Sequence, residues 1–430
     1  MQLIQYPSRN DWRSILQRPI KSFEAIEKEV IPVLKAVKHG GDKALFELTE
    51  KFDQVKIDSL IVTNAEIVAA SNQISDELKK ALAIAYDNIY KFHFAQKTPI
   101  EKSETMPGVV CWRKSVGIQK VGFYIPGGTA PLFSTILMLA IPAKIADCAE
   151  MILCTPPDKN GDIHPAILYA AQLCGVAKIF KVGGSQAIAA MAYGTESIPQ
   201  VYKIFGPGNQ YVMAAKQLVN KDGIAIDMPA GPSEVAIFAD ESANPSFVAA
   251  DLLSQAEHGA DSQVILVSTD IGLINETIIE TEKQLLSLPR VNFASKALEN
   301  SKAILVKDDE EAIEIINAYA PEHLIISTRN DELIGDKIVN AGSIFLGKYT
   351  PEAAGDYASG TNHTLPTNGY ATAYSGVSLD TFYKKITFQS ISEEGLKNIG
   401  PTIETLAANE MLDAHKNAVT IRLESLKNKI

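Results

Sequence analysis

Four histidines in the second half of the sequence stand near carboxylates or amides, groups that can bind metal ions or move protons. The pairs are Gln255 and His258 in "SQAEHG", Glu322 and His323 in "APEHL", Asp356 and His363 in "GDYASGTNHTLPT", and Glu410 and His415 in "ANEMLDAHKN". A single histidine is more often a capping group or a hydrogen-bonded core side chain. Four pairs from distant segments favour a functional site, because zinc binds histidine nitrogen and carboxylate oxygen and a catalytic zinc keeps positions open for substrate.

Two of these pairs differ in what they could do. Gln255 and His258 are three residues apart in "DLLSQAEHG", which reads as a helix that stops at Gly259. They therefore share one helix face, which is either a metal site or the polar side of an amphipathic helix. Glu322 and His323 are adjacent at the start of an expected strand, where neighbouring side chains point apart. An acid–base pair on two sides of a substrate suits them better than a shared ion.

Three loops rich in glycine and small residues each join an expected strand to an expected helix: "YIPGGTAP", "VGGSQA" and "FGPGNQY". Backbone N–H groups at a helix N-terminus favour phosphate, and glycine allows close approach. In "GPGNQY", Tyr211 takes the place of the third glycine of the dinucleotide fingerprint, so this motif alone is a weak signal. Turn geometry could explain the glycines of any one loop. Three such loops in one series favour a dinucleotide or phosphate ligand.

The elements that must position these residues are short apolar strands alternating with helices from about residue 117 onward. This alternation predicts parallel sheets covered on both faces, and ligands of such sheets bind at the carboxyl ends of the strands. There are too many strands for one ordinary sheet, so we expect two doubly wound α/β domains. The first hundred residues are helical in pattern, with a break at Gly40 and Gly41, and we expect them to complete the second series of strands and helices.

Composition and charge exclude several classes of protein. The chain of 430 residues is 46% hydrophobic and carries 40 basic and 51 acidic side chains, a net charge of −11. This balance disfavours a protein held on nucleic acid by phosphate contacts. The N-terminus lacks the pattern of a signal peptide, and the most apolar run, "LFSTILMLAIPAKIADC", reads as a buried helix. The four cysteines form no CxxC pair and read as free thiols in a reducing compartment. We expect a cytoplasmic globular protein without a membrane or nucleic-acid partner.

These segments together resemble a known family. In order, "YIPGGTAPLFSTILMLAIPAKIA", "VGGSQAIAAMAYGTESIP", "FGPGNQYV", "DMPAGPSEV", "DLLSQAEHGADSQVILVS", "APEHL", "GDYASGTNHTLPT" and "AHKNAV" are similar to histidinol dehydrogenase, over essentially the whole chain from about residue 20. The resemblance implies two incomplete Rossmann-like domains with small terminal arms. We accordingly expect arms at 1–20 and 380–430, a first α/β domain from 21–120 and 237–379, and a second from 121–236.

The resemblance also implies an activity and a set of site residues. The family oxidises L-histidinol to L-histidine through an aldehyde-level intermediate, as the last step of histidine biosynthesis, with two NAD⁺, one zinc and a homodimer with shared active sites. The implied zinc ligands are Gln255, His258, Asp356 and His415, with His415 reaching the neighbouring subunit's site. The implied NAD⁺ contacts are Tyr124, Gln186 and Asn209. The implied substrate contacts are Ser233, Gln255, His258, His323, Asp356, His363, Glu410 and His415.

Within this resemblance, His323 is the expected general base for the alcohol and Glu322 the expected base that activates water. Two alternatives remain. One is a paralogue with the same site acting on another small alcohol, and Glu410 argues against an anionic substrate because a carboxylate suits a cationic amino or imidazole group. The other is a non-catalytic nucleotide-binding or zinc-stabilised assembly protein, which would leave the ordered His, Glu and Asp set without a task.

Overall fold

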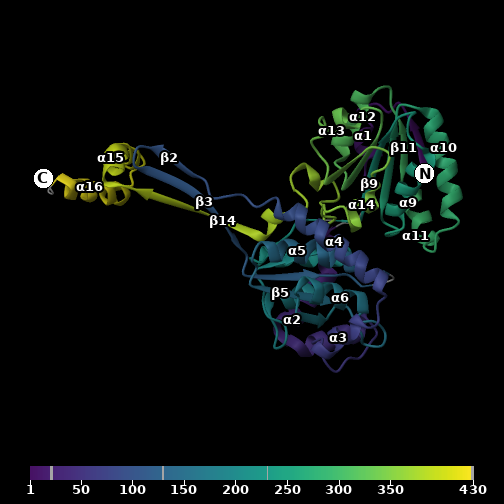
Figure 1. The fold of residues 1–430 in the computed structure, drawn as a ribbon, viewed down its shortest axis with the longest axis horizontal. Coiled ribbons are helices and arrows are strands. Elements are labelled where there is room, and N and C mark those ends of the chain that lie inside the picture. The colour runs from purple at the N-terminus through teal and green to yellow at the C-terminus, as the bar shows by residue number, and fades with distance from the viewer. Residues whose placement is uncertain (20–22, 128–129, 230, 428–430) are drawn as a thin grey trace. The chain divides into compact units, whose positions relative to one another are not determined.

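The computed structural model describes residues 1–19, 23–127, 130–229 and 231–427. These residues form two units (Figure 1). Unit 1 consists of Met1–Ala95 and Ile118–Phe382, and unit 2 of Gln96–Gly117 and Tyr383–Ile430. Unit 1 contains two parallel sheets with helices around them, so the expectation of two doubly wound α/β domains is confirmed.

The first parallel sheet has five strands in the order β6-β5-β4-β7-β8. Its strands are β4 (Lys120–Tyr124), β5 (Glu150–Thr155), β6 (Lys178–Lys181), β7 (Lys203–Phe205) and β8 (Ala225–Ile226). The connecting helices are α5 (Phe133–Ile145), α6 (Pro165–Cys174), α7 (Gly184–Tyr193) and α8 (Gln210–Lys221). Helix α5 is buried on nearly all sides, as its largely apolar sequence predicts.

The N-terminal helices complete this five-stranded sheet. They are α2 (Phe23–Phe52), which is kinked at Gly41, α3 (Asn64–Ser71) and α4 (Asp76–Phe94). Helix α2 packs on α7 and α8, α3 on α6, and α4 on α5, and Figure 1 shows α2 to α6 grouped around β5. The assignment of residues 21–120 to the same domain as 237–379 is therefore wrong for these helices. Their apolar faces share a core with residues such as Ile152 and Ile188 instead.

The second parallel sheet has six strands in the order β1-β11-β10-β9-β12-β13. Its strands are β1 (Gln2–Gln5), β9 (Glu234–Ala239), β10 (Gln263–Ser268), β11 (Lys302–Leu305), β12 (His323–Ser327) and β13 (Ser343–Leu346). Its main helices are α9 (Pro245–Ala256), α10 (Ile271–Leu285), α11 (Val291–Glu299), α12 (Asp309–Tyr319), α13 (Asp331–Gly335) and α14 (Glu352–Tyr357). Short helical segments lie at α1 (Trp12–Ile15), η1 (Tyr370–Thr372) and η2 (Leu379–Phe382).

The first residues of the chain belong to this six-stranded sheet. Strand β1 pairs in parallel with β11, from Gln2 opposite Lys302 to Gln5 opposite Leu305. Residues 1–20 were expected to form an arm, but the described part of this segment adds an edge strand instead. The segment "QLIQ" hydrogen-bonds its backbone N–H and C=O groups to β11, at a sheet edge that would otherwise be open.

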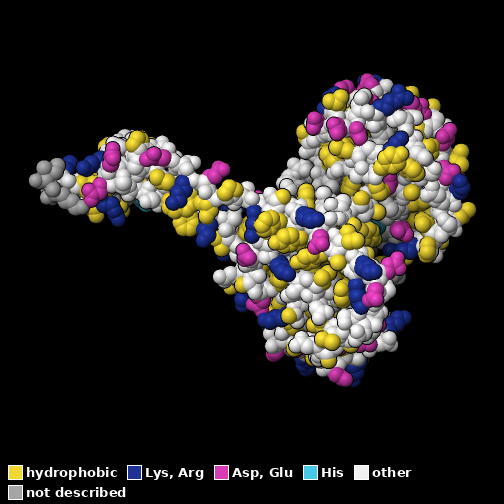
Figure 2. Space-filling model, in the orientation of Figure 1, with side chains coloured by type: hydrophobic (Ala, Val, Ile, Leu, Met, Phe, Trp, Pro, Cys, Tyr) yellow, Lys and Arg dark blue, Asp and Glu magenta, His cyan; other side chains and the backbone are white. Residues whose placement is uncertain are grey.

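Unit 2 is an antiparallel sheet of β2 (Lys102–Met106), β3 (Val109–Gly117) and β14 (Tyr383–Ile391), with helices α15 (Glu393–Asn409) and α16 (Asp413–Lys427). Strands β3 and β14 pair along their whole length, and Trp112 stacks on Phe388 with ring centroids 5.3 Å apart. The expected C-terminal arm is thus joined by residues 96–117, because β14 needs β3 as its hydrogen-bonding partner. Ile386, Phe388 and Ile391 remain exposed on it, and Figure 2 shows apolar side chains on this unit's surface.

No helix in the described residues is long and apolar enough to cross a membrane. All four cysteines lie in the described chain and are free, and Cys148, Cys154 and Cys174 are buried.

Candidate active site

A buried cluster of ionisable side chains surrounds His323, the first residue of β12. Glu322 precedes it on the same loop, Gln255 comes from the last turn of α9, and Glu352 and Asp356 lie four residues apart on α14. Residues at this spacing share one helix face. Its central residue, His323, stands at the amino end of β12, at the strand start where the sequence predicted it.

The contacts within the cluster converge on the imidazole ring. Gln255 Nε2 lies 2.9 Å from His323 Nδ1 and donates to Glu352 Oε1 at 3.0 Å. Asp356 Oδ1 lies 3.4 Å from His323 Nε2, and Glu322 Oε2 lies 3.6 Å from His323 Nδ1. The backbone N–H of Glu234 donates to Glu322 Oε2 at 3.0 Å, which orients that carboxylate.

Several oxygen atoms in this cluster are buried without a hydrogen-bond partner. Gln255 Oε1, Glu352 Oε2 and Asp356 Oδ1 are all in this state. Ligand atoms of His323, Glu352 and Asp356 also lie within 4.8 Å of one another. Buried oxygen atoms without partners are costly, and a bound cation satisfies them. The donor set of amide oxygen, carboxylate oxygen and imidazole nitrogen is therefore one that a divalent metal ion would fit.

The electrostatics of the cluster also favour the binding of a cation. Burial raises the pKa of Glu352 to about 8 even though His323 opposes this. Burial alone would lower the pKa of His323, but the charges of Glu352 and Glu322 raise it well above its ordinary value. Three carboxylates thus surround one imidazole in a dry environment. The imidazolium compensates only part of their charge.

The other predicted residues of unit 1 lie around this cluster with different partners. His258 follows the end of α9, and its ring is outside the group of mutually close ligand atoms. Burial lowers the pKa of His258, while the charges of Asp356 and Glu322 in the cluster oppose this. His363 Nδ1 lies 2.8 Å from the carbonyl oxygen of Asp356 and its Nε2 lies 3.0 Å from Thr135 Oγ1. Ser233 immediately precedes β9 and lines a small pocket with Arg18 and Asp261.

The two predicted residues of unit 2 are both exposed there. Glu410 directly follows α15, and His415 lies in the first turn of α16. Sequence reasoning missed Glu352, which is buried. Its signal was available, because "PEAAGD" places a glutamate four residues before Asp356. A glutamate in the first turn of a helix is ordinarily a solvent-exposed partner of the helix dipole.

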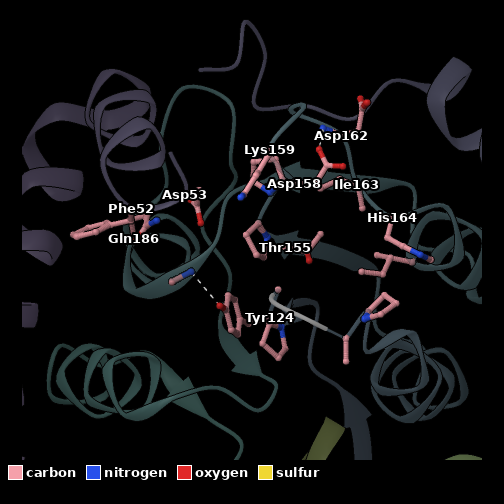
Figure 3. Close-up of a pocket in the computed structure, with 18 of the residues that line it drawn as sticks. Phe52, Asp53, Tyr124, Thr155, Asp158, Lys159, Asp162, Ile163, His164 and Gln186 are labelled. Carbon is pink, nitrogen blue, oxygen red and sulfur yellow. Dashed lines mark hydrogen bonds between the residues drawn. The ribbon is translucent and has the colours of Figure 1, made fainter. Parts of the chain in front are cut away.

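A second site lies at the carboxyl ends of the five-stranded sheet. A cavity of about 1250 Å³ is lined by Tyr124, Gln186 and Asn209, the three predicted cofactor contacts. The structure brings them together from the end of β4, the first turn of α7 and the N-cap of α8. This volume exceeds the roughly 300–1,000 Å³ of an ordinary small-molecule pocket, so a dinucleotide has room. Figure 3 shows Tyr124 and Gln186 on one side of this pocket and His164 on the other.

The three predicted contacts already make local bonds. Tyr124 Oη accepts the N–H of Gly184 at 3.0 Å, at the start of α7. Asn209 caps α8 by accepting the N–H groups of Tyr211 and Val212 at 3.0 and 3.1 Å. Gln186 is buried. Hydrogen bonding to the protein thus orients Tyr124 and Asn209 at the pocket wall.

The loop glycines are required by the packing of the loops on one another. A Cβ at Gly127 would lie 2.2 Å from Pro156 Cγ, and one at Gly183 would lie 2.5 Å from Pro156 Cβ. Gly206 has a φ of +125°, and a Cβ there would lie 2.1 Å from the carbonyl oxygen of Tyr124. Turn geometry and close packing thus explain these glycines without a ligand, and they bring the loops together around the pocket. Gly128 and Thr129 of the first loop lie outside the described residues.

The fold and the two sites define an α/β enzyme of the Rossmann-like class, with a dinucleotide-sized pocket on one sheet and a buried acid–base cluster on the other. Comparison with known proteins identifies the family. Residues 16–423 match the family model of histidinol dehydrogenase. The chain therefore belongs to the histidinol dehydrogenase family and is an oxidoreductase.

The relatives are similar over their whole length. The histidinol dehydrogenase of Bacteroides thetaiotaomicron is 64% identical over 427 residues, which are 99% of this chain and 100% of that protein. The one from Escherichia coli O6:H1 is 54% identical over 418 residues, 96% of this chain and 95% of that protein. The crystal structure of histidinol dehydrogenase from Elizabethkingia anophelis matches with a TM-score of 0.97 at 55% identity and covers 99% of both chains.

Proposed function

We propose that this enzyme oxidises L-histidinol to L-histidine in two successive two-electron steps, with two NAD⁺ and one bound zinc ion. The observation that carries the proposal is the buried cluster at His323, in which Gln255 Oε1 and Asp356 Oδ1 lack partners beside an acid–base pair. Membership of the family supports the choice of alcohol. The four free cysteines agree with a reducing compartment, and we assign the enzyme to the cytoplasm.

We assign the zinc ion to Gln255, His258 and Asp356, with His415 contributed by the partner subunit of a homodimer. Zinc bound there would supply a fixed positive charge that holds the imidazole and amino groups of the substrate. Glu352 supports this assignment, because it accepts a hydrogen of the Gln255 amide and thereby aims Oε1 away from itself. The exposed apolar side chains of unit 2 support a subunit partner.

The protein's own groups then move the protons. NAD⁺ would supply the hydride acceptor in each step, and Tyr124, Gln186 and Asn209 would hold it. His323 Nε2, which has no hydrogen-bond partner, would take the hydroxyl proton of the alcohol in the first step, in the neutral form that the positive charge of a bound zinc ion would favour. Glu322, oriented by the Glu234 N–H, takes a proton from water as it adds to the aldehyde. His323 takes the proton of the hydrate as the second hydride leaves, which completes the four-electron oxidation.

The remaining predicted contacts complete the substrate site. Glu410 of the partner subunit would pair with a cationic group of the substrate, while Ser233 and His363 would line it. A cationic amino alcohol therefore suits this site better than a sulfonated one, since a carboxylate repels an anionic head.

The experiment that tests this function is the number of NADH formed per L-histidinol consumed, in zinc-replete enzyme, before and after chelation. We expect two NADH per substrate, loss of activity on chelation, and recovery with Zn²⁺ but not with Mg²⁺. One NADH with release of aldehyde would contradict the role of Glu322. No NADH from histidinol, with turnover of another small alcohol, would establish a different substrate.

A further inference from the structure

The large cavity also contains polar groups that none of the roles above uses. Asp53 follows the end of α2, and its Oδ2 is buried without a hydrogen-bond partner. Thr155, the last residue of β5, is completely buried, and its Oγ1 also lacks a partner. Both residues line the cavity, and Figure 3 shows Asp53 and Thr155 directed into it. Two buried oxygen atoms without partners, in residues that line the same cavity, favour a ligand that brings hydroxyl groups to it.

The topology of the sheet says which part of a dinucleotide would lie near these two residues. The order β6-β5-β4-β7-β8 places the third, second, first, fourth and fifth strands side by side, as in a Rossmann domain. In that arrangement the pyrophosphate lies at the loop after the first strand, here β4. The adenosine ribose lies at the end of the second strand, here β5, where an acidic residue usually binds its hydroxyls.

This chain has Thr155 at the place of that acidic residue. Asp158, in the loop after β5, also lines the cavity, but its Oδ1 already accepts the N–H groups of Asn160 and Asp162. A carboxylate without such a partner is brought by a different element, since α2 packs across α7 and α8 and ends at Phe52, next to Asp53. The cavity is also lined by Glu66, whose charge is compensated by Lys181 at 2.7 Å. No basic residue is recorded as a partner of Asp53 among the described residues, so its charge is available to a ligand.

We infer that Asp53 and Thr155 form the subsite for the adenosine ribose of NAD⁺, with the Asp53 carboxylate accepting the ribose hydroxyls and excluding a 2′-phosphate. This inference rests on the proposed use of NAD⁺ and adds the residues that choose it over NADP⁺. A carboxylate accepts two neighbouring hydroxyl groups well, and it repels a phosphate at the same position. Burial also raises the pKa of Asp53 to about 6, so the group is ionised at neutral pH but poorly solvated.

The test measures binding directly, by isothermal titration of the zinc-replete enzyme with ADP-ribose and with 2′-phospho-ADP-ribose. Asp53→Asn should weaken ADP-ribose binding by about tenfold to a hundredfold, because a hydrogen bond to a charged group is lost. The same variant should narrow the preference for ADP-ribose over its 2′-phosphate. Thr155→Val should weaken ADP-ribose binding by about twofold to tenfold, as expected for a neutral hydrogen bond.

Asp58→Asn is the matched control, because Asp58 lies on the same loop, is exposed, and loses the same charge. It should shift ADP-ribose affinity by less than about twofold, as distant exposed charges are screened. Equal affinities of Asp53→Asn and wild type for ADP-ribose would overturn the subsite and leave the use of NAD⁺ intact. Failure of the wild type to bind either ADP-ribose or NAD⁺ would overturn the proposed function itself.

Discussion

The surroundings of His323 suit a side chain that accepts and donates protons. Its ring is buried, with the Gln255 amide beside Nδ1 and Asp356 beside Nε2. The ring centroids of His323 and Phe345 are 5.9 Å apart. A histidine placed in the core only to fill space would need one hydrogen-bond partner. The three surrounding carboxylates far exceed that need, and they suit a group that must accept a proton during a reaction.

Replacement of His323 by asparagine tests this role. His323→Asn should fold and retain zinc, because asparagine can still bond to Gln255, while kcat should fall by about 10²–10⁴-fold through loss of the general base. Steady-state kinetics with a parallel measurement of bound zinc would check this. A rate close to wild type would rule out His323 as the base.

The buried Asp53 carboxylate should lower the stability of the folded protein when it is ionised, and an uncharged asparagine at this position should not. Its pKa is raised to about 6 by burial, so the folded state binds the proton more tightly than the unfolded chain does. The stabilisation from this protonation is complete below the unfolded pKa, near 4, and is lost as the pH rises through 6. Asp53→Asn should therefore raise Tm relative to wild type at pH 8 and give a smaller gain at pH 5. Thermal unfolding of the ligand-free enzyme at both pH values would measure this, and a lower Tm at pH 8 would contradict it.

At the scale of elements, the loop between β7 and α8 is fixed by a buried ion pair. Lys216 on α8 and Asp227 after β8 pair with both side chains buried. Lys216 Nζ donates to the carbonyl of Gly206 at 2.9 Å, and the N–H of Gly206 donates to Asp227 Oδ2 at 2.8 Å. Both polar groups of one glycine are thus held, at the position where Gly206 presses on the Tyr124 backbone.

Removal of one member of this pair should be costly. Lys216→Met should lower the free energy of unfolding by about 3–5 kcal/mol, because it leaves a buried carboxylate without its counter-charge. Lys221→Met is the matched control on the same helix, since Lys221 pairs with Glu27 at 3.0 Å on the surface. That control should cost no more than about 1 kcal/mol. Urea unfolding would compare the two variants. Equal losses of unfolding free energy would contradict the stabilising role of the buried Lys216–Asp227 pair.

The sequence predicted which segments form strands and helices better than it predicted which elements pack together. Alternation of apolar strands and helices identified both parallel sheets, because each strand carries its own signal. The partner of an amphipathic helix carries no such signal, since an apolar face fits any apolar surface of the right shape. For this reason α2 to α4 were assigned to the wrong sheet, and the strand "QLIQ" was assigned to an arm.

The same limit applies to the candidate site. Gln255, Glu322, His323 and Asp356 stood out by type and spacing, and the structure gathers them. Glu352 was missed because a glutamate early in a helix resembles an ordinary surface residue. Asp53 was missed because only the packing of α2 brings it to the cavity. His258 was grouped with Gln255 by helical spacing, but α9 ends at Ala256, before the residue is reached.

At the scale of the whole molecule, the proposed active site requires two copies of the chain. His415 and Glu410 belong to unit 2, where both are exposed. If His415 acts on the partner subunit, two inactive variants can complement each other. A dimer that pairs a His323→Asn chain with a His415→Asn chain contains one site in which both histidines are intact.

Mixing the two variants should therefore restore activity. Equal amounts, unfolded and refolded together, should regain about a quarter of the wild-type rate, since half of the dimers are mixed and each mixed dimer has one intact site. Each variant refolded alone provides the control and should stay inactive. Absence of recovery in a mixture shown to contain mixed dimers would place His415 in the site of its own chain.

Unit 2 is made from two segments that leave the ribosome at very different times. Strands β2 and β3 emerge early, but β14, the long partner of β3, emerges only after all of unit 1 has been synthesised. Until then the nascent chain carries an open strand edge that could pair with another chain. Arg113 and Lys114 in the middle of β3 are exposed charges of the kind that discourage such pairing. Unit 2 can therefore complete its sheet only after the last fifty or so residues, which include β14, have been synthesised.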